Sequence, residues 1–145
     1  MKRIKITIVL NIILPIILGG FVYYLYSPEV WFVEKVDTII GVEIHLSAKR
    51  GSFTWEFVRF YLLDMLWAYA LVFALFFFMD NNAARLWAIF LLTLSFSCMM
   101  EILQLISVVN GTFDIMDIMA MLFAELVAVF VIKRLLKGGS LNETC

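Results

Sequence analysis

Four long apolar segments dominate the chain, at residues 6–26, 57–79, 87–106 and 113–132. Each is at least as long as the roughly 20 residues that an α-helix needs to cross about 30 Å of hydrocarbon. Their apolar runs are continuous rather than alternating, which argues against the strands of a membrane barrel. The pattern therefore predicts an all-α integral membrane protein built as a four-transmembrane-helix bundle.

The segment between the first two apolar runs is too polar to cross a membrane. Its sequence Ser27-Pro28-Glu29 is a helix-start signal, with a capping serine and a proline at the first helical position. The residues up to Ile40 then mix apolar and charged side chains, which predicts a short amphipathic helix in the outer membrane interface. Residues 42–47 alternate after Gly41, so a short strand is the alternative there.

Composition agrees with a membrane protein. The chain has 145 residues, of which 64% are hydrophobic, and a mean hydropathy of +1.01, whereas a soluble domain has about 45–50% apolar residues. This length predicts one membrane domain over residues 1–145. The net charge is −1 and no basic stripe occurs, so nucleic acid is not an expected partner.

Basic residues predict the orientation of the chain. Because positive charge beside membrane spans stays in the cytoplasm, both termini are expected on that side. No small-residue cleavage site follows the first apolar run, so it is interpreted as an uncleaved span. The basic residues are Lys2, Arg3 and Lys5 before the first span and Lys133, Arg134 and Lys137 after the last.

Polar side chains interrupt the apolar pattern between Glu101 and Asp117. Glu101 and Gln104 are three residues apart and share one helix face, as do Asp114 and Asp117. With both termini in the cytoplasm, all four fall in the outer half of the membrane. Because a charge in hydrocarbon is costly, intramembrane carboxylates are candidates for function. A polar pocket between spans two, three and four, open to the outer surface, is expected.

Charge in this predicted pocket is unbalanced. Arg59 in the second span is the natural counter-charge, and it faces Asp64, Glu101, Asp114 and Asp117. A divalent cation such as Mg²⁺ or Ca²⁺ held by these four carboxylates, a shared proton, or a cationic group of a ligand would neutralise the excess. Two aromatic residues of the same span, Tyr61 and Trp67, are expected to line the pocket.

These residues also have structural interpretations. A capping residue, an interhelical hydrogen bond or an ion pair explains a polar group without a ligand. Asp114 can cap the fourth helix, with Asp117 in a near-capping box. Glu101, Gln104 and a protonated Glu125 can form hydrogen bonds between helices. Arg59 can pair with Asp64, and Glu56 can lie exposed at the interface.

The stretch E-x-x-Q at Glu101 and Gln104, followed by G-T-F-D-x-x-D at the next turn, resembles the VanZ-like family of small bacterial membrane proteins. The segment RFYLLDMLWAYAL is similar to the helix of that family that carries an Arg and an Asp-x-x-Trp element. The resemblance covers roughly residues 53–130. The site residues that it implies are Arg59, Asp64, Trp67, Glu101, Gln104, Asp114 and Asp117.

The resemblance implies an envelope accessory protein of the bacterial cytoplasmic membrane, associated with resistance to the glycopeptide teicoplanin. We expect its acidic pocket to bind a lipid-anchored or glycopeptide ligand beside the membrane lipids. One alternative is a small enzyme that uses carboxylate or divalent-metal chemistry on a lipid-linked cell-wall precursor. A second is a proton-coupled transporter subunit, in which Glu125 would relay protons inward.

Overall fold

The computed structural model describes residues 2–26, 31–41, 57–79, 81–109 and 112–141. About 90% of these residues are helical, and the described part contains no strand. The helices are α1 (Lys2–Tyr26), α2 (Trp31–Ile40), the π-helix η1 (Phe57–Leu62), α4 (Leu63–Phe78), the 3₁₀-helix η2 (Ala83–Arg85), α5 (Leu86–Leu105) and α6 (Ile115–Leu141).

Three helical segments are long and apolar enough to cross a membrane: Ile4–Tyr26, Ala83–Leu105 and Ile115–Gly138. Many of their large apolar side chains are exposed, as expected for surfaces that contact lipid. Three such helices in one chain are typical of a multi-pass membrane protein. The predicted second span consists of η1 followed by α4, and α4 alone has only 16 residues.

The described helices occur where the apolar pattern predicts them. The amphipathic helix is also present as α2, where Val33 is buried and the Tyr24 hydroxyl of α1 donates a 2.5 Å hydrogen bond to Asp37 Oδ1. One boundary differs, because α6 continues to Leu141 instead of ending near Ile132. The added turns contain lysine, arginine and leucine, which favour helix, and no proline. The helix-start signal at 27–29 and the alternative strand at 42–47 lie outside the described residues.

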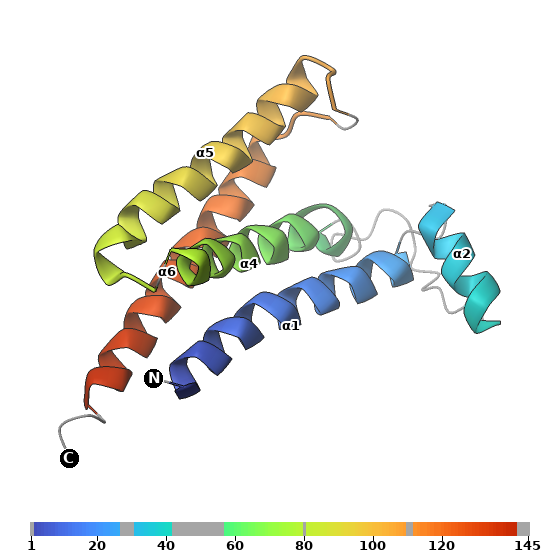
Figure 1. Ribbon diagram of the computed structural model, residues 1–145. Helices are drawn as coiled ribbons and strands as arrows, with labels where there is room; N and C mark the ends of the chain where they lie inside the picture. Colours follow the sequence, from blue (N-terminus) through green and yellow to red (C-terminus); the bar gives the residue numbers. More distant parts are fainter. Residues whose placement is uncertain (1, 27–30, 42–56, 80, 110–111, 142–145) are drawn as a thin grey trace.

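Helix α4 lies at the centre of the molecule and contacts α1, α5 and α6. Figure 1 shows α1 and α4 running side by side in opposite directions, and α5 and α6 forming a second antiparallel pair. The start of α1 and the end of α6 lie at one end of the molecule, called the terminal end below. The connection between α5 and α6 lies at the opposite end, called the hairpin end.

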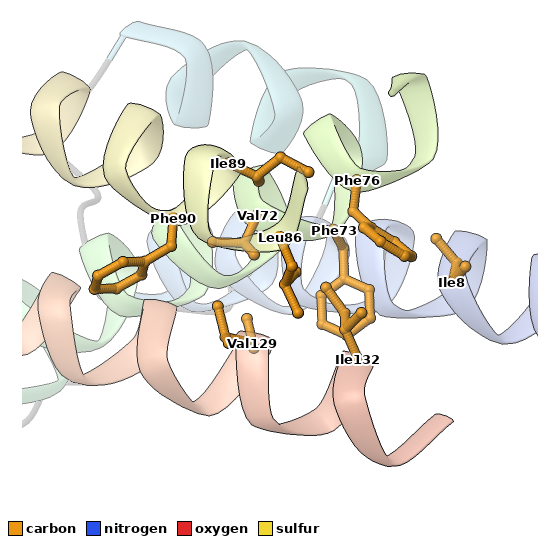
Figure 2. Packing of buried hydrophobic residues seen from close by; sticks show 10 residues of the cluster. Ile8, Val72, Phe73, Phe76, Leu86, Ile89, Phe90, Val129 and Ile132 are labelled. Atoms are coloured by element: carbon orange, nitrogen blue, oxygen red, sulfur yellow. The ribbon is translucent and has the colours of Figure 1, made fainter. Parts of the chain in front are cut away.

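The main hydrophobic core lies toward the terminal end. It combines Ile8 of α1, Phe73 and Phe76 of α4, Ile89 of α5 and Ile132 of α6, with five further buried residues (Figure 2). Phe73, Phe76 and Ile89 have no exposed surface. Because tightly packed aromatic and branched side chains resist rearrangement, this core holds the four long helices together at one end. Polar groups and hollows are found toward the other end.

Candidate functional site

Buried polar side chains follow one face of α5. Thr93, Ser97 and Glu101 are spaced four residues apart and are all buried, together with Glu125 of α6. Side chains at this spacing lie one above the other on a helix. A polar line therefore runs inside the protein, from Glu101 near the hairpin end to Thr93 near the middle of α5.

Glu101 forms a hydrogen bond with the backbone at the start of α6. Its carboxylate is only 3% exposed, and Oε2 accepts the backbone N–H of Asp114 at 3.2 Å. Asp114 in turn caps α6, because its Oδ1 accepts the N–H of Met116 at 2.8 Å, as the capping interpretation predicts. The Tyr61 hydroxyl of η1 donates to Asp114 Oδ2 at 3.2 Å. Asp114 thus joins η1, α5 and α6.

Asp117 occupies the position that would complete a capping box. In that motif its side chain accepts the N–H of the capping residue, but here Glu101 accepts the N–H of Asp114. Asp117 Oδ1 is buried and has no hydrogen-bond partner among the described residues. Asp117 also interacts electrostatically with Asp64, Glu101 and Asp114. Four carboxylates are therefore gathered at the meeting point of α4, α5 and α6.

A hollow of about 260 Å³ adjoins two of these carboxylates, Asp64 and Glu101, whereas Asp114 and Asp117 are not among its lining residues. It lies between α4, α5 and α6, and we call it the acidic pocket. Asp64 and Trp67 of α4 and Glu101, Gln104 and Ser97 of α5 line it, with apolar side chains around them. The acidic pocket can accept hydrogen bonds or a positive charge from a ligand, while Trp67 offers an aromatic face.

A second hollow, the α1–α4 groove, has a volume of about 570 Å³. Its lining is apolar apart from Asp64 and Tyr23, and it shares Asp64, Trp67 and Leu71 of α4 with the acidic pocket. About two turns of α4, from Asp64 to Leu71, therefore lie between an acidic hollow and an apolar one. The sequence did not predict this groove, because its two walls come from segments about fifty residues apart.

Two glycines of α1 leave the groove open. A Cβ on Gly19 would lie 3.9 Å from Leu66 Cδ1, which is an ordinary contact, and a Cβ on Gly20 would meet nothing within 4 Å. Neither glycine is therefore required by a close approach of another helix. Both line the groove, where their missing side chains leave space.

Glu125 lies deeper, fully buried between α5 and α6. The Ser97 hydroxyl donates to its Oε1 at 2.9 Å, which confirms the predicted interhelical hydrogen bond. Its Oε2 has no hydrogen-bond partner in the described part of the chain. The hydroxyl of nearby Thr93 donates instead to the Phe90 carbonyl at 2.9 Å. Sequence reasoning missed Ser97 and Thr93, although their four-residue spacing from Glu101 was a usable signal.

Two other predicted groups lie partly or wholly outside the described residues. The backbone of Arg59 lies in η1, but its side chain and the whole of Glu56 are outside the described part. Within residues 2–26, 31–41, 57–79, 81–109 and 112–141, no group of three or more His, Cys, Asp or Glu side chains is arranged to hold a metal ion. The gathered carboxylates therefore provide hydrogen-bond acceptors and negative charge, but not a formed divalent-metal ligand set.

These features describe a membrane protein whose polar groups collect beside two unlike hollows at one end. We compared the chain with protein-family models, with curated proteins and with solved structures, and none of the three comparisons found a match.

Proposed function

We propose that this protein is a VanZ-like envelope accessory protein that binds a membrane-anchored ligand on the outer side of the membrane. The observation that carries the proposal is the contact between the two hollows along Asp64, Trp67 and Leu71 of α4. A ligand with a hydrocarbon chain and a polar head needs these two environments side by side. The α1–α4 groove would take the chain and the acidic pocket the head.

The proposed orientation rests on charge and length. Residues 57–78 of η1 and α4 form one continuous helical stretch, which is long enough for a fourth crossing. Lys5, Lys133, Arg134 and Lys137 all belong to the terminal end, and basic residues of this kind remain in the cytoplasm. The hairpin end and the acidic pocket would then belong to the outer leaflet.

The dimensions of the groove suit one hydrocarbon chain. Its α1 wall runs from Ile12 to Tyr23, 11 residue steps, or about 16 Å at the rise of an α-helix. Its α4 wall runs over the same number of steps, from Leu63 to Ala74. This is about half of the roughly 30 Å hydrocarbon thickness, which is the share of one leaflet.

The acidic pocket favours a head group that donates hydrogen bonds or carries positive charge. Asp64 and Glu101 line it, and Asp117 adds a buried oxygen without a partner among the described residues. Amines and hydroxyl groups complement such carboxylates, and Trp67 can stack on a ring. A lipid-linked cell-wall precursor or a glycopeptide has this character, and the VanZ-like resemblance adds a contribution to teicoplanin resistance.

The groove can be blocked without disturbing the fold. Gly20 lines the groove, and Gly20→Leu adds bulk there without a clash, because no atom lies within 4 Å of a Cβ at this position. Gly138→Leu is the matched control, since Gly138 of α6 has equally open surroundings and does not line either hollow. Asp64→Asn removes the charge shared by both hollows while keeping the shape of the side chain.

Binding can be measured through Trp67 with brominated single-chain amphiphiles, which quench tryptophan fluorescence on contact. One probe should carry a primary amine and the other a carboxylate. We expect the amine probe to quench Trp67 at lower concentration, and Trp67→Phe to remove that signal. Gly20→Leu should abolish the quenching and Asp64→Asn should remove the preference for the amine. Equal quenching in Gly20→Leu and Gly138→Leu would refute a chain in the groove.

The cellular arm uses the same variants in a heterologous host. We expect wild type and Gly138→Leu to lower susceptibility to teicoplanin, and Gly20→Leu and Asp64→Asn to lose this protection at equal expression. No change of susceptibility with the wild-type protein would remove glycopeptide resistance from the proposal. Loss of expression in both Asp64→Asn and Gly20→Leu would make these positions structural.

A further inference from the structure

We propose that Glu125, Ser97 and Thr93 form a binding site for one small monovalent cation such as Na⁺, which reaches it from the acidic pocket. This inference goes beyond the proposed function and does not depend on an amphiphilic ligand. It rests on the buried carboxylate between α5 and α6 and on the side chain that connects it with the pocket.

The carboxylate of Glu125 is incompletely satisfied. It has no exposed surface, and only Oε1 accepts a hydrogen bond, from Ser97 at 2.9 Å. Oε2 is buried with no partner among the described residues. Buried polar atoms in proteins almost always have a partner, and an orphan oxygen at this depth points to a bound water or ion.

The surrounding groups supply oxygen atoms. The Ser97 hydroxyl directs its proton to Glu125, and the Thr93 hydroxyl directs its proton to the Phe90 carbonyl at 2.9 Å. Their oxygen lone pairs can face a cation, and the Thr93 side chain interacts with the same carboxyl group as Ser97 does. A set made only of carboxylate and hydroxyl oxygens selects hard cations rather than the soft metals that prefer nitrogen and sulfur.

The single negative charge of Glu125 favours a monovalent cation over a divalent one. Glu125 is the one acidic residue among the buried members of this cluster, so a single positive charge neutralises it. A divalent ion would leave a net charge in the interior of the membrane, which is costly. The site therefore suits a monovalent cation.

Ser97 connects the site with the outside. It lines the acidic pocket and also donates to Glu125, so one side chain separates the pocket from the proposed cation. The pocket carboxylates Asp64 and Glu101 raise the local concentration of cations at this entrance. On the other side, Ile89 and Phe90 belong to the apolar core that fills the terminal end. The cation would therefore exchange only with the hairpin end.

The test uses the purified full-length protein in detergent, with NaCl replaced stepwise by choline chloride at constant ionic strength. Thermal unfolding is followed by tryptophan fluorescence, and binding is measured directly with radioactive ²²Na⁺. We expect one ion bound per chain and a saturable rise in Tm of about 5 °C when Na⁺ reaches roughly 100 times its Kd. Glu125→Gln should lose this rise, because it keeps an acceptor for Ser97 but removes the charge.

Matched variants separate the site from general charge effects. Glu34→Gln, the same substitution on the exposed face of α2, should keep the full Na⁺ response. Ser97→Ala should raise the Kd for Na⁺ at least tenfold. The proposal is overturned if Na⁺ and choline give the same Tm, if Glu125→Gln keeps the response, or if Tm follows pH alone, which would mean a bound proton. If Glu125→Gln cannot be purified, an unchanged Kd in both Ser97→Ala and Thr93→Val overturns it.

Discussion

The contact between Glu101 and the start of α6 can be tested with two substitutions of similar size. Glu101→Gln and Glu101→Leu both remove the negative charge. Only glutamine retains an oxygen that can accept the Asp114 N–H, which Glu101 accepts at 3.2 Å. Position 101 is only 3% exposed, and the leucine variant leaves that part-buried N–H without its acceptor.

The magnitude follows from the lost hydrogen bond. A hydrogen bond of this kind contributes about 0.5–1.5 kcal/mol. For a chain of this length its loss corresponds to a Tm roughly 1–6 °C lower for Glu101→Leu than for Glu101→Gln. Glu101→Gln itself should melt at or above wild type, since it removes one of four neighbouring like charges.

Thermal unfolding of the purified variants, followed by tryptophan fluorescence, measures both differences. Glu34→Gln and Glu34→Leu form the matched control pair, because Glu34 lies on the exposed face of α2, and they should differ by less than about 0.5 kcal/mol. If Glu101→Leu melts at or above Glu101→Gln, the hydrogen bond does not hold α6. If Glu101→Gln melts well below wild type, the reasoning about charge repulsion is wrong.

Three further substitutions probe the same scaffold by thermal unfolding. Asp114→Ala removes the cap of α6 and should cost about 0.5–2 kcal/mol, whereas an unchanged Tm would contradict a capping role. Tyr69→Phe removes a 2.6 Å hydrogen bond to Asn11 between α4 and α1 and should cost about 0.5–1.5 kcal/mol; no loss would mean that the bond adds nothing. Phe73→Ala opens the core and should cost about 3–5 kcal/mol, far more than Phe78→Ala at an exposed position, and equal losses would contradict the packing.

Local sequence patterns determined where the helices of this protein lie. Long apolar runs predicted the segments that became α1, η1 with α4, α5 and α6, and the mixed polar segment predicted α2. Helix capping was one of the two interpretations that the sequence offered for Asp114, and it could be recognised because the cap and the N–H that it accepts are two residues apart. Such features depend on neighbouring residues alone, which is why no tertiary information was needed.

The partners of the polar side chains were decided only by the tertiary structure. Glu101 accepts from Asp114 and Ser97 donates to Glu125 across α5 and α6, while Tyr61 reaches Asp114 across 53 positions of the sequence. A helix that is apolar on almost every side carries no stripe to mark the face that meets its neighbour. Rotation and crossing of such helices follow from packing, and the sequence pattern cannot specify them.

The α1–α4 groove is the clearest case of this limit. Gly19 and Gly20 lie in a continuous apolar run that gives no sign of a groove, yet in the folded chain they border an open hollow against α4. Apolar residues predicted that α1 would enter the membrane, but lipid and protein are equally apolar surroundings for it. The sequence alone therefore determined which segments are helical and apolar, and the tertiary structure decided which faces enclose a pocket and which face the lipid.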